Sequence, residues 1–138
     1  MRYQIPSLSG KKYRNRSAFC ATVGLFDVQV AVFFDVDDVY NFYKCEHGIK
    51  MEKNFLSRGA RGQAGVVFDD DGLPYFFLHY ATENPAIGTV AHEVAHIALD
   101  ICDHVGVKVT KKHDETFARI VDTLVQQVVD GIQERHKA

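Results

Sequence analysis

The chain is poor in the features that mark secreted, membrane-spanning and nucleic-acid-binding proteins. It has three cysteines, three prolines and no tryptophan in 138 residues, and its formal net charge is −2. An odd number of cysteines without C-x-x-C spacing argues against a disulfide framework and predicts a cytoplasmic protein. A charge this close to zero predicts neither nucleic acid nor a membrane surface as a partner. No apolar run approaches the roughly 20 residues that a membrane-spanning helix needs.

The length and composition predict one domain over residues 1–138. Hydrophobic residues make up 46% and charged residues 25%, which is an ordinary balance for a globular protein. Residues 1–18 are polar and basic and contain no apolar stretch of the kind found in secretory signals. We expect them to form an irregular arm. The basic residues of this arm could contact nucleic acid, although short charged runs are usually only solvated.

Three strands are expected in the first part of the chain. Residues 19–35 are rich in β-branched and aromatic residues and predict one strand inside a sheet. Residues 64–69 and 73–81 predict a hairpin, because an Asp-Gly pair separates two apolar runs. A helix is expected between these strands, with Asp37 as its N-cap and Gly48 at its end.

Two helices are expected in the second part of the chain. Asn84 and Pro85 are typical of an N-cap and a first helical residue, and Gly106 is typical of a helix end. The last helix is expected to begin at about Asp114, with apolar residues at helical spacing up to Ile132. Together these elements predict an α+β fold, with a small, mainly antiparallel sheet packed on the two helices.

The segment His92-Glu93-Val94-Ala95-His96 matches the pattern H-E-x-x-H within the first of these helices. Two histidines four residues apart lie on the same face of a helix, so both imidazoles can bind one metal ion. Glu93 lies on a neighbouring face, where its carboxylate can act on a water molecule instead of binding the metal. The pattern predicts a zinc site with a general base, as in zinc peptidases.

A catalytic zinc ion usually has three protein ligands, so a third is expected downstream. Glu115 is our prediction, because it lies 19 residues after His96 in the first turn of the last helix. His104, His113 and Asp114 are the alternatives. Asp114 better suits an N-cap, His113 precedes the helix, and His104 could serve only if the metal helix ends early.

Cys102 occupies the position of a third histidine in a related layout, H-E-x-x-H-x-x-G-x-x-H. Leu99 stands where that layout has its glycine. Without the glycine the helix should continue past this point, so Cys102 would turn away from the two histidines. We expect Cys102 to be a buried apolar residue.

The stretch that contains His92, Glu93, His96 and Glu115 resembles the gluzincin metallopeptidases, especially the small H-E-x-x-H proteins of bacterial and phage genomes. The resemblance covers about residues 64–125 and is specific at these positions and at Ala118. It implies a minimal zincin-like domain that binds Zn²⁺ and cleaves a protein or peptide substrate. Residues 1–60 have no counterpart in this resemblance, so it says nothing about substrate specificity.

The expected reaction is hydrolysis of a peptide bond by a water molecule that Glu93 deprotonates. Tyr80, His79 and His113 are the candidates for a donor to the oxyanion. Tyr80 and His79 end a predicted strand, which could be a sheet edge that a peptide joins by strand addition.

Two other functions remain open from the sequence. The chain could hold zinc without proteolysis, as a regulatory or structural site. It could also be a metal-dependent nuclease that uses His92, His96 and His104.

Overall fold

The computed structural model describes residues 19–137, and the expected arm at residues 1–18 lies outside them. The elements follow in the order β1 (Phe19–Val23), a 3₁₀ turn (Gly24–Phe26), β2 (Val28–Phe33), α1 (Val36–His47), β3 (Gly62–Phe68), β4 (Pro74–Tyr80), α2 (Ile87–Val105) and α3 (Glu115–Lys137). The four strands form one sheet in the order β1-β2-β4-β3. The outer pairs are antiparallel and the central pair, β2 and β4, is parallel. The expected α+β fold is confirmed.

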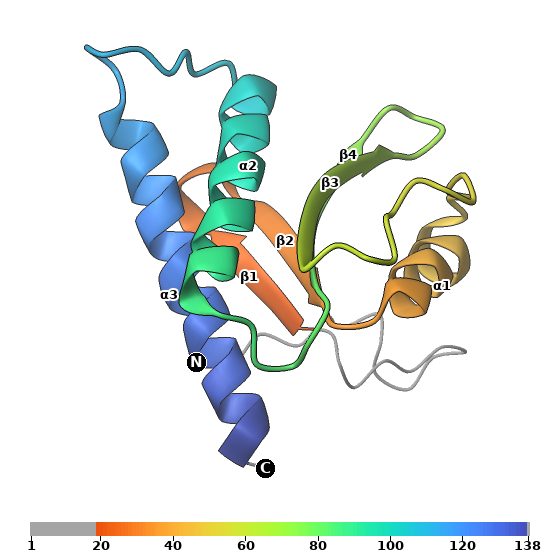
Figure 1. The fold of residues 1–138 in the computed structure, drawn as a ribbon. Coiled ribbons are helices and arrows are strands. Elements are labelled where there is room, and N and C mark those ends of the chain that lie inside the picture. Colours follow the sequence, from red (N-terminus) through yellow and green to blue (C-terminus); the bar gives the residue numbers. More distant parts are fainter. Residues whose placement is uncertain (1–18, 138) are drawn as a thin grey trace.

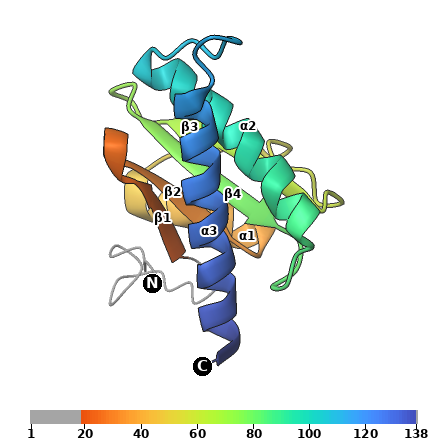
Figure 2. The ribbon, with the colours of Figure 1, turned by 90° about the vertical axis from the view of Figure 1, so that its left-hand side faces the viewer.

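The sheet is covered on both faces. Helices α2 and α3 lie side by side on one face and α1 lies on the other, as Figures 1 and 2 show from two directions. A large apolar cluster fills the space between the sheet and α2 and α3, and a second cluster lies under α1. None of the helices within residues 19–137 has the length and apolarity to cross a membrane.

The expectation of one strand over residues 19–35 is wrong. The segment forms two antiparallel strands, in which Val23 pairs with Val28 across a tight turn. Asp27 makes this turn with a positive φ of 52°, a conformation that Asp tolerates better than most residues. The run of β-branched residues hid the turn, because Gly24 was the only breaker in it.

The helix ends were predicted better than the helix starts. Gly48 and Gly106 both end their helices in the left-handed conformation, with φ of 65° and 80°, as expected of glycine. Helix α1 instead begins one turn earlier than Asp37 would cap it, because the Asp35 side chain accepts a hydrogen bond from the Asp37 N–H at 2.8 Å. Helix α2 begins at Ile87 without a side-chain cap.

The two edges of the sheet differ. On β1, the side-chain amide of Gln127 on α3 accepts from the Thr22 N–H at 2.8 Å and donates to the Thr22 carbonyl at 2.7 Å. These are the two bonds that a neighbouring strand would make, so α3 closes this edge.

The outer edge of β3 is open. Arg61 pairs with Ala81 through a backbone hydrogen bond, as Asp69 does with Leu73, and the register of β3 on β4 alternates between these points. The even-numbered residues of β3 therefore direct their N–H and C=O groups away from β4. Within residues 19–137 these groups, on Gly62, Ala64 and Val66, have no hydrogen-bond partner.

Candidate functional site

His92 and His96 converge on the exposed face of α2. Their Nε2 atoms are 3.3 Å apart, and 68% of the His92 side chain is exposed. Two nitrogen ligands of one tetrahedral zinc ion lie roughly 3.3–3.4 Å apart, as follows from Zn–N distances of roughly 2.0–2.1 Å. An N–H···N hydrogen bond between the two rings has a similar length. Metal binding and this hydrogen bond are therefore alternative states of one histidine pair.

Glu93 lies beside this pair on the side of α2 that faces β3. Its side chain is only 11% exposed, and its Oε2 atom is 3.9 Å from the Nε2 atom of His92. The carboxylate reaches this position because Gly62 on the edge strand has no side chain. A Cβ atom at Gly62 would lie 2.9 Å from the Glu93 Cγ atom. The edge strand and the carboxylate are thus in direct contact.

A hollow of about 340 Å³ opens between the edge strand and the start of α2. It is lined by Arg61, Gly62, Gly88, Thr89, His92 and Glu93. The hollow holds one acid, one imidazole, one hydroxyl and one guanidinium within a small volume. Sequence reasoning missed Arg61, Gly62, Gly88 and Thr89. Thr89 had one signal, since it lies one turn before His92 on the same helix.

The structure does not bring Glu115 to the histidine pair. Glu115 lines a separate hollow beside Val107 and Lys108, just past the end of α2. Its carboxylate accepts a hydrogen bond from Arg119 at 3.2 Å. Within residues 19–137 no three His, Cys, Asp or Glu side chains form a group that could hold a metal ion. The reason is axial distance, since α2 continues nine residues past His96 to Val105, about 14 Å along the helix.

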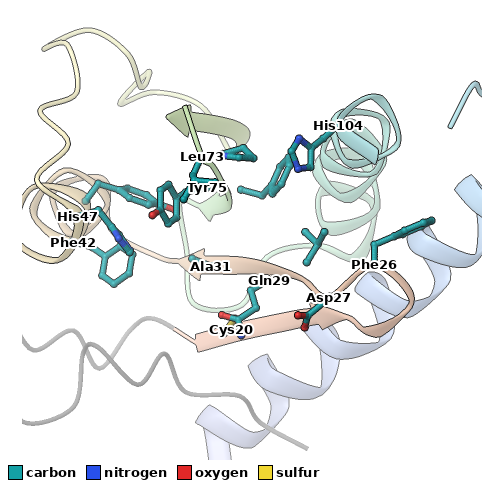
Figure 3. A pocket seen from close by; sticks show the side chains of 14 residues that line it. Cys20, Phe26, Asp27, Gln29, Ala31, Phe42, His47, Leu73, Tyr75 and His104 are labelled. Carbon is teal, nitrogen blue, oxygen red and sulfur yellow. The ribbon is translucent and has the colours of Figure 1, made fainter. Parts of the chain in front are cut away.

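The other predicted ligands and donors are also spread out. His113 lines the same hollow as Glu115. His104 contacts the ring of Phe76, with 5.8 Å between the ring centroids. It faces a cavity of about 560 Å³ that lies against the sheet and includes neither His92 nor His96 (Figure 3). Helix α2 does not end early, so His104 does not join the histidine pair.

Tyr80 and His79 are buried within the sheet. The strand that holds them, β4, lies between β2 and β3, so the expectation that it forms a sheet edge is wrong. Tyr80 is fully buried and its hydroxyl donates to the Val90 carbonyl at 3.3 Å. Burial raises the pKa of Tyr80 and lowers the pKa of His79. Neither side chain reaches the hollow beside Glu93, because the apolar pattern of β4 serves a strand with neighbours on both sides.

Cys102 is buried, as expected, and burial raises the pKa of its thiol.

Comparisons with known proteins give no relative for this chain: no family model, no curated protein and no solved structure matches it.

Proposed function

We propose that the chain is a metal-dependent hydrolase that cleaves peptide bonds at the histidine pair of α2. The observation that carries this proposal is the geometry of His92 and His96, whose Nε2 atoms lie 3.3 Å apart beside the buried carboxylate of Glu93. Isolated surface histidines have no reason to hold this spacing next to a desolvated acid. Zn²⁺ suits the pair best, because imidazole nitrogens are among its preferred ligands.

The two histidines would hold the metal through Nε2. A bound zinc ion would supply a Lewis acid that polarises the scissile carbonyl and makes water a better nucleophile at neutral pH. Glu93 would accept the proton of the attacking water and return it to the leaving amine. Arg61 and Thr89 line the same hollow and would supply donors to the developing oxyanion, in place of Tyr80 and His113.

A peptide substrate is favoured by the open edge of β3. This edge directs the backbone groups of Gly62, Ala64 and Val66 outward, and Gly62 lies against Glu93. An extended peptide that joins β3 as a further strand would bring its own backbone past the carboxylate. The opposite edge is closed by Gln127, which leaves β3 as the edge for strand addition among the described strands. Neither a nucleotide nor a sugar would use these groups in this way.

We also propose the cytoplasm as the place of action. Cys20, Cys45 and Cys102 are all free thiols, which suits a reducing compartment.

The test compares Glu93→Gln with wild-type protein for zinc content and for cleavage of a peptide library. The expected result is one zinc ion per chain in both proteins and a loss of cleavage of about 10²–10⁴-fold in the variant. Glu52→Gln, at an exposed acid far from α2 along the chain, is the matched control and should retain activity. Zinc without cleavage in the wild-type protein would favour the non-proteolytic zinc-binding function, and no zinc at all would overturn both.

A further inference from the structure

We infer that Asp122 of α3, and not Glu115, is the carboxylate that completes the metal site of His92 and His96. The inference rests on the proposed function, because it assumes that the histidine pair binds a metal ion. It follows from the register of α3 along α2, from the face of α3 on which each acid lies, and from the partners that each acid has.

Both ends of the pair of helices are fixed by contacts. At the start of α3, Glu115 shares a hollow with Val107, just after α2 ends. At the end of α3, Arg135 donates to the carboxylate of Glu83 at 2.7 Å, four residues before α2 begins. Helix α3 therefore runs back along the whole of α2, in the opposite direction.

This register places the histidine pair beside the middle of α3. The stretch from Glu115 to Arg135 lies along the stretch from Val107 back to Glu83. In proportion, His96 is level with residue 124 and His92 with residue 127 or 128, to within about one turn. Glu115 is six turns before the far end of α3 and more than two turns from the level of His96.

Two acids of α3 lie near this level, Asp122 and Asp130, and they lie on different faces. Gln127 marks the face that closes the β1 edge. At about 100° per residue, Asp130 is about 60° from Gln127, whereas Asp122 is about 140° away. Asp122 thus lies on the side of α3 turned away from β1, next to Val121, which packs against the core under α2. Asp130 also accepts a hydrogen bond from Gln126 at 3.0 Å.

Asp122 is available as a ligand. It is exposed and has no hydrogen bond or ion pair among residues 19–137, whereas Glu115 is paired with Arg119. A carboxylate oxygen is an ordinary third ligand beside two imidazoles. Since no three-ligand group is assembled within the described residues, metal binding has to draw Asp122 toward the pair. Zinc should then tighten the packing of α3 on α2.

The test measures Zn²⁺ affinity of the full chain by competition with a chelator, and the visible absorption of the Co²⁺ form. Asp122→Asn should lose more than about 100-fold in affinity, beyond the 10–100-fold typical of groups that only orient a ligand. It should also change the Co²⁺ spectrum and lose most of the zinc-induced rise in Tm. Glu115→Gln, the matched control, should retain all three properties, and both variants should retain the Tm of the metal-free protein.

Each other outcome has one meaning. Loss of affinity in Glu115→Gln but not in Asp122→Asn would overturn the inference and restore Glu115 as the ligand. Full affinity in both variants would place the third ligand outside α3 and overturn the inference as well. Absence of zinc binding in the wild-type protein would instead reject the proposed function, because His92 and His96 would then hold no metal.

Discussion

The side-chain amide of Gln127 forms two hydrogen bonds with the backbone of Thr22, at 2.8 and 2.7 Å. The two residues are far apart in the chain, so the contact ties the last helix to the first described strand. An amide has the same donor and acceptor as a peptide unit, and it can take the place of a neighbouring strand. The sheet is thereby closed on the side opposite to the candidate site.

Replacing Gln127 by Ala should lower the free energy of unfolding by about 1–3 kcal/mol, since two hydrogen bonds of about 0.5–1.5 kcal/mol each are lost. Urea denaturation measures the change. Gln133→Ala is the matched control, because Gln133 is an exposed glutamine of the same helix. Equal stability of the two variants would mean that water replaces the Gln127 amide at no cost.

Replacing Gly62 by Ala should reduce peptide cleavage at least tenfold and leave zinc affinity unchanged. The new Cβ atom would lie 2.9 Å from Cγ of Glu93 and 3.1 Å from Cγ2 of Thr89, so the carboxylate has to move, and displacements of about 1 Å can cost about 10²-fold in rate. Gly59→Ala, where nothing lies within 4 Å of the new atom, should retain full activity. Full activity of Gly62→Ala would show that the contact with the edge strand does not position Glu93.

The buried imidazole of His79 should make stability fall as the pH drops from 7 towards 5. Burial lowers its pKa in the folded protein below the ordinary value of 6.5, although Asp35 opposes this shift. The unfolded chain then binds more protons between the two pKa values, so the free energy of unfolding decreases as pH falls. One group can contribute up to about 1.4 kcal/mol per pH unit.

The His79→Gln variant should flatten this pH dependence, measured by urea denaturation at several pH values. The dependence should be reduced and not abolished, because burial lowers the pKa of His47 as well. His136→Gln, which removes an exposed imidazole, serves as the control. An unchanged slope in His79→Gln would mean that His79 is protonated alike in the folded and unfolded chains.

One of the three thiols should react quickly with Ellman's reagent at pH 8 in the folded protein. Cys45 is exposed, whereas Cys20 and Cys102 are buried. Burial raises the pKa of Cys20 to about 11, which leaves little thiolate at this pH. Cys45→Ser should remove the fast phase, and a second fast thiol in that variant would show that one of the buried cysteines is accessible in solution.

The sequence predicted the second half of the fold well, because its signals are local. Asp71-Gly72 and Gly106 each determine backbone geometry within a few residues, and the apolar spacing of α2 and α3 matches their buried faces. The first half was predicted less well. A turn at Asp27 depends on the pairing of β1 with β2, and local composition does not reveal that pairing.

The candidate site was predicted only where one helix determines it. His92, Glu93 and His96 are brought together by helical spacing alone. Arg61, Gly62 and the level of Asp122 depend on how β3 and α3 lie along α2, which is a long-range property of the packing. Glu115 was favoured by its sequence context, but the length of α2 beyond His96 keeps it away from the pair.

The bond between Thr22 and Gln127 also sets a time for folding in the cell. A ribosome that adds about 5–20 residues per second needs roughly 5–20 s to go from one residue to the other. During that interval β1 has an unprotected edge and the apolar cluster under α3 has no cover. The nascent chain therefore depends on chaperones or on slow collapse until its last helix has been synthesised, and truncation within α3 should send the chain to aggregation.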